Sequence, residues 1–527
     1  MIGRPGRPPG ALGYYREPPN ALPHRSVMPK RSRMSSVDTA WLRMDRPTNR
    51  MVIVGVLLFD QPVDYRRLVA TFAARFARFQ RFRCRPVEDL AGAWWEETPR
   101  FRLERHVRRA RLPGKADAGA LRRFVARLVA QPFDARRPWW DATLIDYAAG
   151  SALVARIHHS YADGIALIRV MLSLTDASPG AAAQAAAVPE RRRRAAAPAD
   201  GGTLGPLLQP LSDLANQALR ASGGVAEMGL QALLNPDKLV QYARVVGSVA
   251  GELAQLATMP DDSRTRYKGK ARAAKRVAWT EPLPLDEVKA VGRVLDCSVN
   301  DVLLATVAGA LRRYLDQKGD PTRGLELRAL VPVNLRPDAA EIELGNRFGL
   351  VTLLLPIGIA NPLARLYEVH HRMEALKGSY QAPIAFALLG AAGFAPRAVQ
   401  QQMLDLLANK ATAVMTNVPG PQEQLYLAGA PLARIMFWVP QSGDIGMGVS
   451  ILSYNGGVQF GLITDAGRVP DPENVIAHFR PEFDRLLMTV LMEPWDMQRE
   501  PGIVERELGK AARRGGRRSP AAAAGRG

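Results

Sequence analysis

Residues 177–202 divide the chain into two parts. The segment consists almost entirely of alanine, proline, glycine and arginine, and it includes four consecutive arginines at 191–194. It has few large apolar side chains to bury, so we expect a flexible linker. On either side of it, short apolar runs alternate with amphipathic segments, which indicates strands with flanking helices. The sequence therefore predicts two α/β halves joined by a long crossover.

The length of 527 residues is enough for two or three ordinary domains. We expect a disordered basic extension at 1–33 and a disordered basic tail at 501–527. Between them, the sequence predicts an N-terminal domain at 34–176, a helical crossover with a basic connector at 203–279, and a C-terminal domain at 280–500.

The net charge of +21 does not indicate a nucleic-acid binding protein, because more than half of the excess lies in the two terminal segments. The remaining arginines suit a solvated surface, or attraction to the phosphates of an anionic ligand and to acidic lipid headgroups. Two isolated cysteines, Cys84 and Cys297, predict neither a disulfide framework nor a zinc site. We expect no metal.

No secretory signal is visible in the sequence. Two uncharged stretches have the length of a membrane span. Residues 378–396 contain prolines and Gln381, and residues 445–464 are interrupted by a turn-like Ser-Tyr-Asn-Gly-Gly. We therefore expect a cytoplasmic protein, with peripheral contact to the inner face of the plasma membrane or to lipid bodies as a further possibility.

The segment His158-His159-Ser160-Tyr161-Ala162-Asp163-Gly164 follows an apolar run and precedes another. This order predicts a strand, a tight turn and a helix. Histidine is the side chain best suited to remove a proton near neutral pH. His159 lies in the HxxxDG register and is our candidate base, whereas His158 would point to the opposite face of an extended segment. The competing interpretation is two core histidines and a turn aspartate.

The neighbours of the candidate base leave alternatives open. Asp163 could orient His159, or it could anchor the turn through backbone amides or a buried arginine. Gly164 could supply a backbone conformation that other residues resist. A second pair, His370-His371, has no Asp-Gly after it, and we interpret it as surface or interface.

The chain resembles the bacterial wax ester synthase/diacylglycerol acyltransferase family from about Ser35 to Met492. Besides HHxxxDG, several segments match family motifs in the expected order. They are Pro138-Trp139-Trp140-Asp141, Ser298 to Ala305 (SVNDVLLA), Val331 to Arg336 (VPVNLR), Gly345-Asn346-Arg347, Thr416 to Pro421 (TNVPGP) and Leu452 to Gly456 (LSYNG).

The resemblance implies an α/β sandwich fold in two domains, similar to chloramphenicol acetyltransferase, with an active site at the domain interface. It implies that acyl-CoA enters from one side and diacylglycerol or a long-chain alcohol from the other. His159 would take the proton of the hydroxyl, and no metal or redox cofactor is needed. The product would be triacylglycerol or wax ester.

Other residues have a functional and a structural interpretation. Asn300 could donate to an oxyanion or cap the helix that opens at Asp301, and Asn417 could donate or belong to a turn. Arg336 could pair with Asp163 or with a CoA phosphate.

Trp139 replaces the leucine of the family's PLW segment, next to Pro138, and could line the substrate channel or pack. A related acyltransferase with another hydroxyl or amine acceptor, and a non-catalytic lipid-binding protein, are the alternative functions. The sequence does not indicate an oligomeric state.

Overall fold

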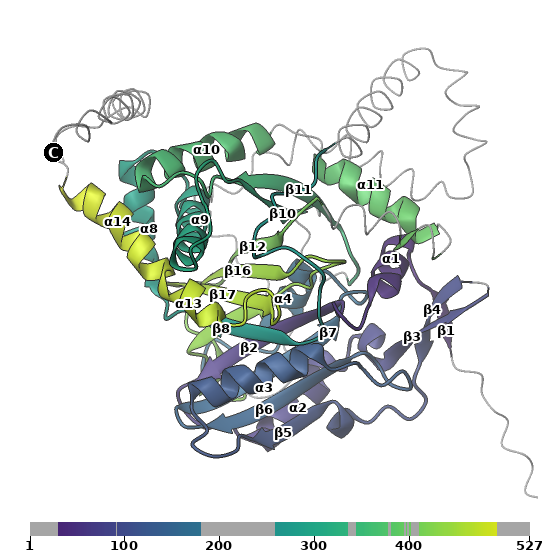
Figure 1. Cartoon of the computed structure of the whole chain (residues 1–527). Coiled ribbons are helices and arrows are strands. Elements are labelled where there is room, and N and C mark those ends of the chain that lie inside the picture. The colour runs from purple at the N-terminus through teal and green to yellow at the C-terminus, as the bar shows by residue number, and fades with distance from the viewer. Residues whose placement is uncertain are drawn as a thin grey trace, which may run out of the picture.

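The computed structural model describes residues 30–90, 92–180, 259–335, 344–377, 381–394, 397, 400–401 and 410–492. Most of the expected linker and crossover and the C-terminal tail lie outside these residues. Each half of the chain builds one large sheet with helices packed outside it (Figure 1). The predicted mixed α/β fold with two halves is confirmed.

The N-terminal sheet has the strand order β15-β2-β7-β6-β5. Its apolar runs become the strands β2 (Val52–Phe59), β5 (Val107–Arg111), β6 (Trp140–Tyr147) and β7 (Gly150–His158). Gly150 has a φ of +136°, and a Cβ there would lie 2.2 Å from the Phe59 carbonyl oxygen, so only glycine fits this turn. Helix α2 (Tyr65–Thr71) continues as a π-helical turn at Phe72–Phe76.

Helix α3 (Ala118–Ala130) begins at Asp117, whose side chain accepts a hydrogen bond from the Ala120 N–H. Its apolar face packs on the N-terminal sheet and also contacts β8 (Lys275–Trp279) of the other half. The two halves therefore share part of one hydrophobic core.

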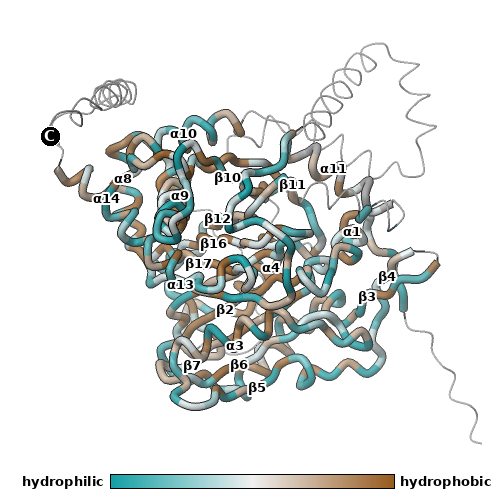
Figure 2. Tube along the Cα trace, in the orientation of Figure 1, coloured by the Kyte–Doolittle hydropathy of each residue, from teal (hydrophilic) through white to brown (hydrophobic). Residues whose placement is uncertain are grey.

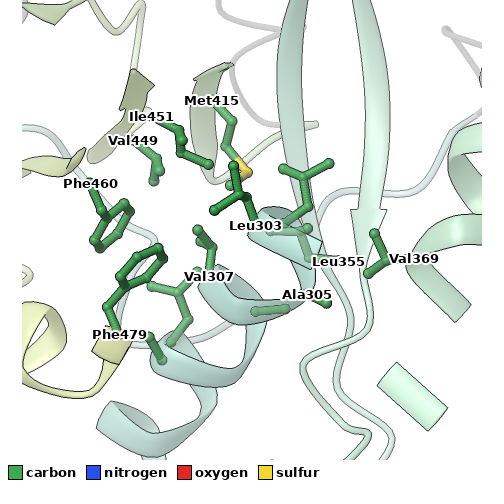
Figure 3. Close-up of a cluster of buried hydrophobic side chains, with 14 of the residues drawn as sticks. Leu303, Ala305, Val307, Leu355, Val369, Met415, Val449, Ile451, Phe460 and Phe479 are labelled. Atoms are coloured by element: carbon green, nitrogen blue, oxygen red, sulfur yellow. The ribbon is translucent and has the colours of Figure 1, made fainter. Parts of the chain in front are cut away.

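The C-terminal sheet has the order β11-β10-β12-β16-β17-β8. Its other strands are β9 (Leu283–Pro284), β10 (Leu327–Asn334), β11 (Phe348–Leu355), β12 (Ala413–Pro419), β16 (Met447–Tyr454) and β17 (Gly457–Asp465). The helices packed with it are α8 (Leu285–Val294), α9 (Val299–Gln317), α10 (Pro362–Lys377), α13 (Pro472–Ala477) and α14 (Phe479–Met492). Figure 3 shows the resulting core, in which Leu303 and Val307 of α9 face Met415, Val449 and Phe460 of the sheet.

One strand crosses between the halves. Strand β15 (Arg434–Trp438) comes from the C-terminal half, yet it pairs antiparallel with β2 at the edge of the N-terminal sheet. The expected boundary at residue 280 therefore does not separate two independent units, and β8 also begins before it. The small strands β13 (Tyr426–Leu427) and β14 (Ala430–Pro431) form the hairpin that leads to β15.

A three-stranded sheet is formed by β1 (Arg31–Arg33), β4 (Gly92–Glu97) and β3 (Cys84–Asp89). Residues 31–33 were expected to be disordered, and that expectation is wrong for them, because they pair with β4. Short 3-10 turns lie at Gln80–Arg83 and Leu103–Arg105. Helix α1 (Ser36–Met44) packs beside α11 (Gln381–Phe394), at the edge of the molecule in Figure 1.

Of the two uncharged stretches, one contains α11, which contacts α1 and β11, and the other is the β16–β17 hairpin. Among the described helices, none taken alone has the length and hydropathy of a membrane span, and α8 with α9 passes only as a pair bent by 101°. In Figure 2, hydrophobic and hydrophilic residues alternate along outer helices such as α10 and α14, as expected for helices with one buried face.

Candidate active site

The histidine pair lies where β7 ends. His158 is the last residue of the strand, and helix α4 (Gly164–Leu172) begins five residues after His159. The His159 N–H donates to the Met51 carbonyl (2.7 Å), which fixes the backbone of the turn against the start of β2. The sequence prediction of strand, turn and helix is confirmed.

Aromatic rings hold the His159 imidazole. The ring stacks on Trp41 of α1, with centroids 4.0 Å apart and planes 18° apart, and it contacts Phe348 of β11 at 5.5 Å. His159 is only 3% exposed. The ring therefore lies at the junction of the two halves, since Trp41 belongs to one of them and Phe348 to the other.

A loop of the C-terminal half is hydrogen-bonded to the same turn. Nδ2 of Asn346 donates to the His159 carbonyl (2.9 Å) and to Oδ1 of Asp38 (2.7 Å). Asp38 is buried, and its Oδ2 lies 3.5 Å from Nη1 of Arg81. Burial raises the pKa of the Asp38 carboxyl group. This bridge links helix α1, the turn and the C-terminal loop.

Asp163 links the same loop to helix α4 through hydrogen bonds. Its Oδ1 accepts from the Ala166 N–H (2.9 Å) as the N-cap of α4, and its Oδ2 accepts from the Arg347 N–H (2.9 Å). The Asp163 N–H donates to the Gly345 carbonyl at 3.3 Å. These contacts match the anchoring interpretation of Asp163, although its charge also acts on His159.

The electrostatics of the site keep His159 neutral. Burial lowers the pKa of His159 to about 4, although the Asp163 carboxylate, the residue's own carbonyl and Asn346 act in the opposite direction. Its Nδ1 is buried without a hydrogen-bond partner among the described residues. A neutral imidazole in this environment can accept a proton at physiological pH.

His158 has a different environment. Its Nδ1 accepts from the Ser160 N–H (3.2 Å) and lies 2.9 Å from Ser160 Oγ, and the Trp139 ring meets it edge-on at 4.9 Å. Burial lowers the pKa of His158 to about 3, and the charges of His159 and Arg50 add to the effect. Its contacts are those of a packed, hydrogen-bonded side chain.

Gly164 does not have the special conformation expected of it. It is the first residue of α4, it is absent from the glycines with positive φ, and a Cβ there would meet Val439 at an ordinary 3.7 Å. The expectation that Gly164 takes a turn conformation that other residues resist is therefore wrong.

Asn300 does not cap helix α9. Ser298 is the N-cap, and it forms a capping box with Asp301. Nδ2 of Asn417 instead donates to Oδ1 of Asn300 at 2.7 Å, so the two asparagines form a pair. No contact among the described residues joins this pair to His159, and oxyanion donation by Asn300 or Asn417 stays a prediction.

The remaining predicted residues lie around this centre or outside it. Trp139 is partly buried in the aromatic core, and its backbone N–H donates to the Tyr161 hydroxyl (2.9 Å). His370 lies 2.9 Å from Asp301, and its neighbour His371 is exposed. Arg336 lies outside the described residues.

Sequence reasoning missed Trp41, Asp38 and the contact role of Asn346. Trp41 and Asp38 lie more than a hundred positions before the histidines, and only their spacing on one helix could have suggested a shared face. No group of three or more His, Cys, Asp or Glu side chains placed to hold a metal occurs in the part of the chain that the structure describes.

Solved structures share the fold of this chain. The wax ester synthase/diacylglycerol acyltransferase from Marinobacter aquaeolei VT8 aligns with a TM-score of 0.59 at 22% identity, covering 88% of this chain and all of that one. The first condensation domain of the CDA synthetase aligns with a TM-score of 0.53 at 17% identity, covering 89% and 97%. The chain thus has the two-half fold shared by these proteins.

Sequence comparison identifies the family. Residues 34–303 match the wax ester synthase/diacylglycerol acyltransferase catalytic domain, and residues 344–487 match the C-terminal domain of the same family. A probable diacylglycerol O-acyltransferase of Mycobacterium tuberculosis strain H37Rv is 29% identical over 452 residues, or 83% of this chain and 92% of that protein. The chain belongs to the wax ester synthase/diacylglycerol acyltransferase family, and it is an acyltransferase.

Proposed function

We propose that this protein transfers a long-chain acyl group from acyl-CoA to the hydroxyl of diacylglycerol or of a fatty alcohol, with His159 as the general base. The observation that carries the proposal is the His159 ring itself. It is neutral and buried, and it stacks on Trp41 and contacts Phe348 where the two halves meet. Family membership supports the acyl-transfer chemistry, and the relative named above supports the acceptor.

The reaction needs the transfer of one proton, first from the acceptor hydroxyl to His159 and then from His159 to the leaving thiolate. The His159 imidazole takes the hydroxyl proton of the acceptor while the oxygen attacks the thioester carbonyl carbon. The tetrahedral intermediate then collapses, the carbon–sulfur bond breaks, and the imidazolium returns the proton to the CoA thiolate. The products are the ester and free CoA, and the step as written uses no cofactor.

Developing charge on the carbonyl oxygen requires a donor, and we propose Asn300 for this role. Its Oδ1 already accepts from Asn417, which fixes the amide plane and leaves Nδ2 as the group available to donate. Removing one such donor typically costs about 10²–10³ in turnover.

We also propose that the enzyme works in the cytoplasm at a lipid surface. Diacylglycerol and long-chain alcohols partition into membranes, and a net charge of +21 favours contact with acidic headgroups.

Release of free CoA thiol tests the proposed function directly. Purified protein with oleoyl-CoA is offered diacylglycerol, hexadecanol, ethanol, hexadecylamine or no acceptor. We expect thiol release that depends on a long-chain hydroxyl, with the ester identified by mass spectrometry. Equal release without any acceptor would indicate a thioesterase, and release with the amine alone would indicate a different acyltransferase; either result contradicts the proposal.

The pH profile should reflect the lowered pKa of His159. Protonated imidazole cannot accept the hydroxyl proton, so kcat/KM should be level above pH about 5 and fall as the pH drops through about 4. Stability falls in the same direction, because the unfolded chain binds more protons between pH about 6.5 and 4. Circular dichroism at each pH separates the two effects. An inflection of kcat/KM near 6.5 would contradict a buried base.

A further inference from the structure

A cavity of about 450 Å³ opens in the N-terminal half, outside the site described above. It lies between the loop that precedes β5 and the loop that precedes β6. Its lining residues are Thr98, Pro99, Arg100, Phe101, Arg102, Arg105, His106, Asp134, Arg136, Arg137 and Pro138. Neither the proton transfer nor the contacts of His159 involve it.

The charge of the lining is strongly positive. Five arginines face a single carboxylate, Asp134, which lies 3.2 Å from Arg136 and 3.4 Å from Arg137. Arg100, Arg102 and Arg105 form no ion pair with any residue that the structure describes. Several guanidinium groups that line one cavity without carboxylate partners are suited to phosphate, which accepts their N–H bonds.

Part of the cavity wall is aromatic. Phe101 stacks on His106 with centroids 5.2 Å apart, and His106 stacks on Trp140 at 4.5 Å. Nδ1 of His106 donates to the Trp140 carbonyl (2.7 Å), and burial lowers the pKa of His106, which keeps its ring neutral. Phe101 is only partly buried, so its ring offers a flat surface to a planar base.

The cavity and the histidines share one end of the sheet. Pro138 lines the cavity, and the carbonyl of the next residue, Trp139, accepts from the His158 N–H at 2.9 Å. Strands β5, β6 and β7 are neighbours, so His106 before β5 lies two strand spacings, about 10 Å, across the sheet from β7. The extended pantetheine arm of CoA can cover such a separation.

We propose that this cavity binds the phosphate groups of the acyl-CoA donor. The inference rests on the proposed function and deepens it, because it assigns the donor to the β5–β6 side of the N-terminal sheet. A concave site with an aromatic wall fits a nucleotide bisphosphate better than a flat lipid surface, which would meet exposed arginines without enclosing its headgroups.

A charge-matched pair of variants tests the assignment. Arg100→Gln/Arg105→Gln removes two charges from the cavity, and Arg123→Gln/Arg127→Gln removes two exposed charges from α3, outside it. Free CoA is titrated calorimetrically into each protein, and KM is measured for oleoyl-CoA and for diacylglycerol. We expect the cavity variant to bind CoA about tenfold more weakly or worse, with a matching rise in KM for oleoyl-CoA alone. The α3 variant should change neither value more than about twofold.

Vesicles containing phosphatidic acid supply the second arm, with thermal unfolding to verify the fold of each variant. Equal vesicle binding by the two variants supports the assignment. Unchanged CoA affinity in the cavity variant overturns it, and so does a loss of vesicle binding confined to that variant, which would assign the cavity to lipid headgroups. Wild-type protein without thiol release would contradict the proposed function instead, and the calorimetric titration would still decide the cavity.

Discussion

Replacing His159 with alanine should lower turnover by about 10²- to 10⁴-fold while the protein remains folded. The imidazole stacks on Trp41 and contacts Phe348 at a tilt, and its neutral form is the one that accepts a proton. The measurement is thiol release with oleoyl-CoA and diacylglycerol, together with circular dichroism. KM for the two substrates should change little, because the proton transfer occurs in the transition state.

Chemical rescue makes this test sharper. His159→Ala leaves a gap of ring size against the face of Trp41, so added imidazole should restore part of the lost turnover. His158→Ala is the matched control, because that ring is also buried but is hydrogen-bonded to Ser160. We expect the control to lose less turnover and to gain nothing from imidazole. Wild-type turnover by His159→Ala would remove His159 from the mechanism.

The sequence predicted the turn that carries the histidine pair because all of its signals are local. The apolar run that forms β7, the histidine pair and the aspartate that caps α4 lie within about twenty consecutive residues. Periodicity and capping preferences depend on near neighbours, and these were sufficient here. The two-half α/β fold followed from the same patterns and from the family motifs.

The partners of the turn could not be predicted in this way. Trp41 and Asn346 reach His159 from positions far apart in the chain, and β15 leaves its own half to pair with β2. Such contacts depend on how the halves pack, which no local pattern records. The interpretation of Asn300 as the cap of helix α9 was wrong, and the local sequence contained the correct cap. Ser298, three residues before Asp301, is a capping-box pattern.

Asp163→Ala should destabilise the protein by about 2–4 kcal/mol, the second large effect that we expect. The helix α4 loses its N-cap, which typically costs about 1 kcal/mol. The Arg347 N–H loses its acceptor at the junction of the halves, which costs a further 1–3 kcal/mol or so. Urea unfolding of wild type and variant at neutral pH measures the difference.

Asp163→Asn separates this anchoring role from an electrostatic one. Its Oδ1 can still accept from the Ala166 N–H, but its amide nitrogen would face the Arg347 N–H, so an intermediate loss of stability is expected. The Asp163 charge raises the pKa of His159, so its removal should move the low-pH inflection of kcat/KM below about 4 and leave activity at neutral pH largely intact. If Asp163→Asn instead lost activity as severely as His159→Ala with full stability, Asp163 would orient the base. Because the carboxylate binds the backbone of both α4 and the C-terminal loop, we expect stability to carry most of its effect.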